Sequence, residues 1–345
     1  MTRLLYAKIS NVVANVLSPA TSCLQILPLV IVLAVASAGF ESAHAQPYPY
    51  RPVRMVIGSA PGSGNDIAGR ILIAKISEAW GQQIVMENRP GANQVIAAEI
   101  VARAPADGYT LLLCGTVTVA INPALYKKLR YDPQRDFAPI ALIGTVPNVL
   151  VVHPSTPVAS VGEFIAYAKA SPGKYSFGSS GIGSTLHLAM EMLMSTTGIK
   201  LVHVPYKGGA LAMADLLGGH LLAIFENVPV GAPSVRAGKV RALGVTAAKR
   251  SAQLPEVPTF IEAGFPGFEI YAWYGVCAPA ATPKAVITRL NDEVNKALNQ
   301  PDLQSRFADL GVDLAPGSSA QFAAFIKSET IKWAKTIKDS GATSD

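Results

Sequence analysis

The sequence predicts an α/β protein with a mostly parallel sheet, organised as two α/β units. Three observations indicate this class. Short strand-like runs of buried character alternate with amphipathic helical runs, which is typical of layered α/β folds. A strand followed by a glycine-rich turn and a helix occurs twice, as "VIGSAPGSGNDIAGRIL" and as "YSFGSSGIGSTLHLAMEML". The chain of 345 residues is also long enough for two domains.

The first 45 residues have the pattern of a secretory signal. Two basic residues precede the apolar run Ile26–Ala36, and Ala43–Ala45 offers small residues for signal peptidase. The alternative is a membrane anchor, but the run is about half of the ~20 residues that a span needs. Pro28 also interrupts its start. We therefore predict a signal peptide at 1–45, cleaved near Ala45, and an exported mature chain.

The elements after the signal follow from hydrophobic periodicity. The predicted strands are apolar runs that end at glycine, proline or polar residues, at 53–58, 82–87, 109–115, 175–179, 201–205, 221–226 and 240–246. The predicted helices are amphipathic, at 66–81, 184–198, 207–220, 282–300 and 321–341. Ser160 with Glu163, and Thr259 with Glu262, form capping boxes that predict two further helix starts.

Two segments are long enough to carry the chain from one unit to the other and back. The first is 140–157 and the second is 268–283. Two crossings would give two lobes, with the C-terminal helices returning to the first. We predict that 46–146 and 272–345 form lobe 1, and that 147–271 form lobe 2.

The first glycine loop does not match a nucleotide site. A dinucleotide fingerprint needs glycine three residues after its second glycine, whereas Gly69 comes five residues after Gly64. Asp66 would repel a pyrophosphate at this helix start. No Gly-Lys-Ser/Thr follows either loop, so the Walker pattern fails as well.

Both loops nevertheless suit a smaller anion. Glycine lets backbone N–H groups converge on a guest, and a helix N-terminus adds a partial positive charge. Hydrogen bonds to a charged group contribute roughly 1.5–3 kcal/mol each. Four or five of them, after ordering costs, are compatible with the about −8 kcal/mol of a micromolar complex. The alternative for either loop alone is an ordinary strand–helix turn.

Polar residues at other strand ends complete a predicted ligand site, because ligands of open α/β sheets bind at the carboxyl ends of strands. Thr116 and Asn122 follow the third strand, and Tyr206 and Asn227 follow strands of the second unit. For each of them the alternative is helix capping or core packing. The predicted ligand-binding residues are Ala60, Pro61, Gly62, Ser63, Gly64, Asn65, Asp66, Thr116, Asn122, Ser179, Ser180, Gly181, Gly183, Ser184, Tyr206 and Asn227.

The remaining cysteines and histidines do not indicate a metal site. Cys114 and Cys277 each end an apolar run, which favours buried unpaired thiols, with a disulfide as the alternative in an oxidising compartment. The histidines are scattered without ligand spacing. We expect His187 to be a hydrogen-bonded interior residue. We expect no metal and no cofactor.

A secreted serine hydrolase is a weaker alternative. The nucleophile elbow is Gly-x-Ser-x-Gly, and "GSSG" at 178–181 is one residue short of it. No spacing identifies an Asp–His pair. The modest positive charge of +6 is spread along the chain, without the Lys/Arg blocks expected for nucleic-acid binding.

Ten sequence blocks occur in the order found in one family of receptors. They are "APGSGNDIAGRIL", "NRPGA", "DGYTLLL", "AINPALY", "DFAPIALIG", "SSGIGSTLHL", "VPYKGG", "RAGKVRALGVT", "VPTFIEAGFPGF" and "WYGVCAPAATP". Over essentially all of the mature chain, the sequence resembles the substrate-binding proteins of tripartite tricarboxylate transporters, the Bug family of periplasmic receptors.

The resemblance implies a periplasmic-binding-protein type II fold, with two lobes joined by a two-strand hinge and a ligand cleft between them. It implies a periplasmic monomer that binds a small carboxylate through the loops Ala60–Asp66 and Ser179–Ser184. Its implied partners are a small and a large integral membrane subunit, and no nucleic acid. A ligand sensor for a signalling partner is the alternative.

Two residues depart from the family pattern. Ser63 stands where the first loop often has a second glycine, and Glu226 precedes Asn227 where Asp-Asn is common. Both changes can alter the shape or charge of the pocket.

Overall fold

The computed structural model describes residues 48–343, so the predicted signal peptide lies outside the described residues. The strands of this part are β1 (Val53–Ile57), β2 (Ile84–Asn88), β3 (Thr110–Gly115), β4 (Phe137–Val152), β5 (Ser176–Ser179), β6 (Val202–Pro205), β7 (Ala223–Asn227), β8 (Arg241–Val245), β9 (Tyr271–Pro279) and β10 (Asp313–Leu314). All seven strands predicted as short apolar runs are present, and the two crossing segments contain β4 and β9.

The helices fill the connections between these strands. They are α3 (Gly64–Trp80), η1 (Ala92–Gln94), α4 (Val95–Ala102), η2 (Val117–Ile121), α5 (Asn122–Leu125), α6 (Pro133–Asp136), α7 (Val161–Lys169), α8 (Thr185–Thr197), α9 (Gly209–Leu217), α10 (Val228–Arg236), α11 (Lys284–Leu298), α12 (Pro301–Asp309) and α13 (Ser319–Ser340). Each of the five amphipathic segments that predicted a helix contains one.

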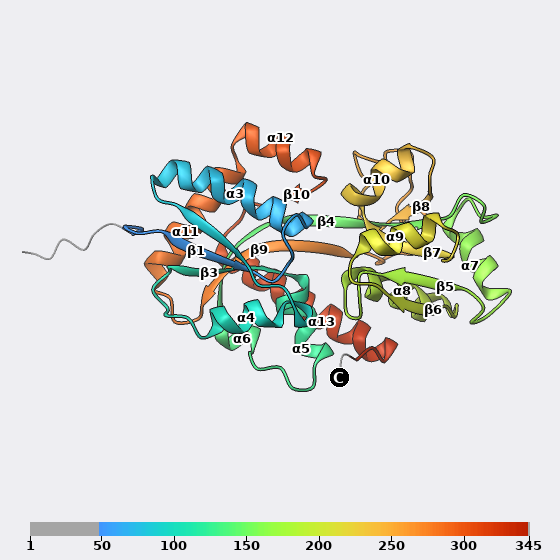
Figure 1. Cartoon of the computed structure of the whole chain (residues 1–345), viewed down its shortest axis with the longest axis horizontal. Helices are drawn as coiled ribbons and strands as arrows, with labels where there is room; N and C mark the ends of the chain where they lie inside the picture. Colours follow the sequence, from blue (N-terminus) through green and yellow to red (C-terminus); the bar gives the residue numbers. More distant parts are fainter. Residues whose placement is uncertain (1–47, 344–345) are drawn as a thin grey trace, which may run out of the picture. The chain divides into compact units, whose positions relative to one another are not determined.

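The sheet runs in the order β2-β1-β3-β9-β4-β7-β5-β6, and β8 and β10 also pair with β4. Strand β1 is parallel to β2 and β3, and β5 is parallel to β6 and β7. Strands β4 and β9 are antiparallel to their partners. The predicted α/β class with parallel pairing is therefore present in both units, and Figure 1 shows β4 and β9 running between them.

The long strand β4 changes partners in its middle. It pairs with β9 up to Pro147, opposite Tyr271, and with β7 from Asn148 onward, opposite Asn227. Thr246 links the two crossing segments where β4 changes partners. Its Oγ1 accepts the Asn148 N–H and donates to the carbonyl of Ile270. We propose that the lobes divide here, as the sequence predicts, with the described residues up to 146 and from 272 in lobe 1 and with 147–271 in lobe 2.

The C-terminal helix α13 contributes large aromatic side chains to the core. Trp333 of α13 is fully buried, and Phe322 packs edge-on against Trp273 of β9 at 5.8 Å between ring centroids. The Trp273 indole donates to Glu329 Oε2 at 3.0 Å. Through these contacts the C-terminal helix packs against β9, the strand that continues to the junction of the two lobes.

One predicted helix start is wrong. Thr259 and Glu262 do form reciprocal capping-box hydrogen bonds, but only turns follow them. Gly264, with a φ of +93°, and Pro266 come too soon for a helix to propagate. The other box does begin a helix, because Ser160 caps α7.

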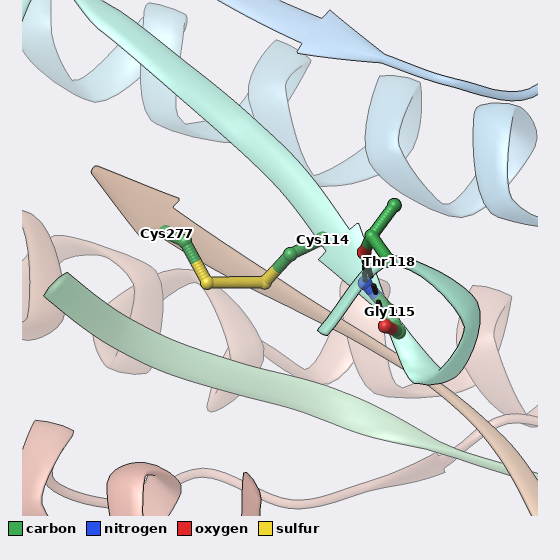
Figure 2. Close-up of a disulfide and its surroundings, with 4 residues drawn as sticks. All are labelled: Cys114, Gly115, Thr118 and Cys277. Carbon is green, nitrogen blue, oxygen red and sulfur yellow. Dashed lines mark hydrogen bonds between the residues drawn. A yellow bond between two sulfur atoms is a disulfide. The ribbon is translucent and has the colours of Figure 1, made fainter. Parts of the chain in front are cut away.

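The expectation of unpaired cysteines is also wrong, because Cys114 of β3 and Cys277 of β9 form a disulfide. Figure 2 shows the bridge between the two strands, just before the turn that Gly115 and Thr118 close by hydrogen bonding. The strands pair Leu112 with Cys277, so the cysteines lie diagonally across the ladder with 6.1 Å between their Cα atoms. Both cysteines are fully buried.

Between residues 48 and 343, no helix is both long enough and apolar enough to cross a bilayer.

We predict that the double variant C114A/C277A loses about 2–4 kcal/mol of unfolding free energy, because the bridge closes a loop between residues 163 positions apart. Urea denaturation of the oxidised wild type, the reduced wild type and the variant measures this loss. A midpoint that neither the reductant nor the double substitution changes would contradict it.

Candidate functional site

A cleft of about 980 Å³ opens between the two lobes. The two glycine loops and the ends of several strands line it, together with residues of β9. The lining residues are Gly58, Ser59, Ala60, Ser63, Gly64, Asn65, Gly91, Ala92, Asn93, Gln94, Gly115, Thr116, Val117, Tyr126, Ser180, Gly181, Ile182, Ser184, Thr185, Pro205, Tyr206, Lys207, Gly208, Gly209, Asn227, Ala272, Trp273 and Tyr274. The two strand–glycine–helix units therefore share one crevice.

In lobe 1, the N-terminus of α3 faces this cleft. Ser63 is the N-cap, and its side chain accepts the Asp66 N–H at 3.3 Å. Within the described part of the chain, no group accepts a hydrogen bond from the N–H of Gly64 or Asn65. The Oδ1 atom of Asn65 is buried without a partner. The first turn of α3 thus keeps hydrogen-bonding capacity for a guest.

Asp66 supports the loop from behind. Its carboxylate accepts from the N–H of Gly62, the guanidinium of Arg70 and the amide of Asn88, at 2.8–2.9 Å. Burial alone would raise the pKa of Asp66, but the bonds from Arg70, Asn88 and Gly62 together hold it below its ordinary value. Asp66 is 2% exposed and does not line the cleft. Its negative charge is compensated within the lobe.

In lobe 2, two stacked histidines support the loop before α8. The rings of His187 and His203 lie 4.0 Å apart between centroids. His187 Nδ1 accepts the N–H of Gly183 at 3.2 Å. The Ser179 hydroxyl lies 2.7 Å from His203 Nε2 and accepts the N–H of Gly181. His187 is buried and hydrogen-bonded, which confirms the expectation of an interior histidine.

The 2.7 Å distance between Ser179 and His203 resembles that of a nucleophile and its base. However, Ser179 is fully buried and does not line the cleft. Burial, and then the neighbouring His187, lowers the pKa of His203 to about 4. This arrangement suits a neutral, hydrogen-bonded support for the loop.

The first turn of α8 also leaves donors for the cleft. Ser184 is the N-cap and accepts the His187 N–H at 3.2 Å. Ser180 and Thr185 line the cleft, and among the described residues neither hydroxyl has a hydrogen-bond partner. The site therefore has a helix N-terminus on each side.

Three further side chains come from strand ends. Asn227 lines the cleft with a buried, unpartnered Oδ1. Tyr206 donates its hydroxyl to Asp215, and burial and this bond raise its pKa to about 12. Tyr274 of β9 brings its hydroxyl close to Gly64, where a Cβ would lie 3.3 Å away. Tyr274 thus reaches the α3 N-terminus from the strand that joins the lobes.

The segment after β2 contributes an unusual backbone. Ala92, Asn93 and Gln94 all have a positive φ, between +45° and +70°, and all line the cleft. The side chains of Asn93 and Asn122 hydrogen-bond at 3.0 Å, and Asn122 also donates to the Asn93 carbonyl. Such strain persists only where the surroundings hold it.

The predicted site residues divide into two groups, and their contact with a ligand stays a prediction. Those that line the cleft are Ala60, Ser63, Gly64, Asn65, Thr116, Ser180, Gly181, Ser184, Tyr206 and Asn227. Those that do not line it are Pro61, Gly62, Asp66, Asn122, Ser179 and Gly183. Thr116 accepts the Trp273 N–H at 2.9 Å, so its hydroxyl also joins β3 to β9.

Sequence reasoning missed the segment 91–94. Tyr274, in the return crossing 268–283, was expected from the sequence as a residue that could pack on the carbon chain of a ligand, and it lines the cleft. The Pro-Gly pair at 90–91 follows β2 with only Arg89 between them. It marks a turn at the carboxyl end of a strand, so the same rule that selected Thr116 would have selected this segment.

Glu226 is an unusual carboxyl group beside the cleft. It is 2% exposed, and its Oε2 has no partner among the described residues. Burial raises the pKa of Glu226 to about 7, although the hydrogen bond from the Asn227 N–H lowers it. In the described range no cluster of His, Cys, Asp or Glu could hold a metal ion.

Residues 68–342 match the family model described as the tripartite tricarboxylate transporter family receptor. The chain belongs to this receptor family. It is 40% identical to the UPF0065 protein of the tcbD-tcbE intergenic region of Pseudomonas sp. strain P51, over 89% of this chain and 91% of that protein. It is 36% identical to BugT of Bordetella pertussis, over 91% and 97%.

Solved structures of receptors share the fold. The R. palustris protein Rpa4515, solved with adipate, has a TM-score of 0.79 and 37% identity, covering 86% of this chain and 99% of that one. The periplasmic binding protein BugD has a TM-score of 0.76 and 34% sequence identity, and the match covers 86% of this chain and 100% of BugD. MatC of Rhodopseudomonas palustris, solved with bound malate, has a TM-score of 0.76 and 31% sequence identity, and the match covers 84% of this chain and 100% of MatC. This receptor therefore has the two-lobed periplasmic-binding fold.

We predict that His203 makes this receptor less stable as the pH falls from about 6.5 toward 4. Its pKa is lower in the folded protein than in the unfolded chain, so the unfolded chain takes up the proton first. If the whole difference in pKa between the folded and unfolded states of His203 counted, it would change the free energy of unfolding by about 3 kcal/mol. Because His203 is half-buried, solvent screening reduces the expected effect to about 1 kcal/mol between pH 7 and 5.

Urea denaturation at several pH values tests this loss against His203→Gln, which should lose less stability on acidification. The exposed His220 of the same lobe provides the control His220→Gln, which should follow the wild type. Parallel pH profiles for all three proteins would contradict the role of His203.

Proposed function

We propose that this receptor is exported to the periplasm, captures a small carboxylate between its lobes and delivers it to the membrane subunits of a tripartite transporter. The observation that carries the proposal is the pair of helix N-termini, of α3 and α8, which open on one cleft. A carboxylate can satisfy backbone N–H groups from both, and each charge-assisted bond contributes roughly 1.5–3 kcal/mol.

The neutral polar side chains of the cleft favour the same ligand class. Asn65 and Asn227 have buried Oδ1 atoms without partners, and turning the amide offers Nδ2 donors to a carboxylate instead. Lys207 also lines the cleft, whereas Asp66 is neutralised behind it. The related receptors solved with adipate and malate, both dicarboxylates, support this class for the present chain.

Capture of a ligand between the lobes requires the two lobes to come into contact. Gly183 of lobe 2 lies at a contact with lobe 1. A Cβ at Gly183 would overlap the buried side chain of Leu125 and lie 3.3 Å from Asn93 Nδ2, both in lobe 1. The absence of a side chain at Gly183 therefore lets the α8 loop approach lobe 1. A ligand that bridges the lobes shifts the population toward this closed arrangement.

Adipate and malate should raise the melting temperature of the purified protein. At about 100 times Kd a ligand adds about 2.7 kcal/mol of stability, which corresponds to several degrees. A thermal-shift screen with both acids, citrate and the neutral diamide adipamide measures this effect. Adipamide has the shape of adipate without its charges, so it should leave the melting temperature unchanged.

The capture proposal would fail if no carboxylate stabilised the protein, or if adipamide did so as strongly as adipate. The delivery step is tested separately, by uptake of the stabilising acid into cells with and without the gene. Unchanged uptake in the deletion strain would contradict delivery while leaving capture intact.

Gly183→Ala should weaken adipate binding at least tenfold, which is about 1.4 kcal/mol, because the new methyl group holds the lobes apart. Calorimetric titration measures the affinity. Gly198→Ala is a matched control: Gly198 ends the same helix with the same φ of +74°, and nothing lies within 4 Å of its Cβ position.

Both substitutions strain a left-handed backbone and should lower stability similarly, by about 1 kcal/mol. Only Gly183→Ala should change the affinity. Equal affinities for the two variants would contradict the role of Gly183 in closure.

A further inference from the structure

Glu226 lies directly behind the lobe 2 wall of the cleft. It belongs to β7, opposite Val149 of β4. A Cβ at Gly209, the first residue of α9, would overlap Glu226 Oε2. Gly209 and Asn227 both line the cleft. The carboxyl group is therefore one layer away from a bound molecule, with the backbone of Gly209 between them.

The surroundings compensate a negative charge on this carboxyl only by one hydrogen bond and by the partial positive charge of a helix N-terminus. Its Oε1 accepts the Asn227 N–H at 2.8 Å, and its Oε2 points at the α9 N-terminus without a hydrogen bond. Among the described residues, no lysine, arginine or histidine forms an ion pair with it. Asp66, in contrast, has Arg70 and three hydrogen-bond donors.

The groups that face Glu226 from each neighbouring element are almost all uncharged. Gly209 begins α9, Gly231 lies on α10, and Val149 lies on β4. Tyr274 of β9 is the titratable neighbour. Burial, and then the proximity of Glu226, raises the pKa of Tyr274 to about 12, so it stays neutral. Glu226 is thus a buried acid beside the cleft wall without a positively charged side chain as its partner.

We propose that Glu226 is protonated when this cleft holds an anion, so that ligand capture takes up a proton and the receptor discriminates by the charge of its ligand. The proposal deepens the function proposed above and rests on it. An ionised Glu226 would place a second negative charge behind the wall that an anionic ligand contacts. Without a nearby cation, the two charges repel across a poorly solvated layer.

The direction of the pH dependence follows from linkage. In the free protein the carboxyl loses its proton as the pH rises through about 7. A bound anion favours the protonated form further, so binding becomes weaker as the pH rises above that point. The substitution Glu226→Gln keeps the shape of the side chain and leaves no charge to lose. The affinity of this variant should be independent of pH over the same range.

Calorimetric titration with adipate at about pH 6.5 and pH 8.5 tests this coupling. The wild type should bind about tenfold more weakly at the higher pH, and Glu226→Gln should bind equally at both. Measurements near pH 7 in two buffers of different ionisation enthalpy should show proton uptake for the wild type only. Glu256→Gln removes an exposed carboxylate of the same lobe and should behave as the wild type.

Equal pH dependence in the wild type and in Glu226→Gln, or no proton uptake, would overturn the proposal. Titration of the side-chain ¹³C carboxyl signal that Glu226→Gln removes tests the free protein without any ligand. A midpoint near neutrality supports the proposal, and a midpoint near the ordinary glutamate value of about 4.3 overturns it. If adipate bound at neither pH, the proposed ligand class would fail for adipate, and the carboxyl titration would decide on Glu226.

Discussion

The backbone donors in the first turns of α3 and α8 are the constraint on which the site depends. The first N–H groups of a helix have no partner inside it, and here two such groups of donors open on one cleft. The folded chain satisfies some of them internally, as Ser63 and Ser184 do by capping. The N–H groups that remain without a partner can donate hydrogen bonds to an acceptor between the lobes.

The two lobes support these donors by different chemistry. Asp66 holds the first loop with a charged group that Arg70 neutralises, whereas the imidazoles of His187 and His203 hold the second by hydrogen bonding. The two halves of the site therefore present the same kind of donor on different supports.

The sequence predicted what local patterns determine. Apolar runs that end at glycine located the seven short strands, and the repeated strand–glycine–helix unit indicated two loops of the same kind. The helix expected after Thr259 is absent because a capping box describes only a first turn, and Gly264 with Pro266 prevents a second.

The Cys114–Cys277 bridge could not be chosen over two free thiols from the sequence, because that choice depends on the register between β3 and β9. Glu226 stood out only as a departure from a family pattern. Its missing positive partner is a property of the tertiary structure.

The position of Pro147 connects the hinge to the site. Proline has no N–H to give to a sheet ladder, and β4 exchanges β9 for β7 immediately after it. Asn148 and Asn227 form the first pair beyond the exchange, and Asn227 already lines the cleft. From the other crossing strand, Tyr274 reaches the α3 N-terminus. A rotation between the lobes at this junction would move Asn227 relative to Tyr274. The residues that join the lobes therefore include residues of the cleft itself, so we expect occupancy of the cleft and the angle between the lobes to be coupled through β4 and β9.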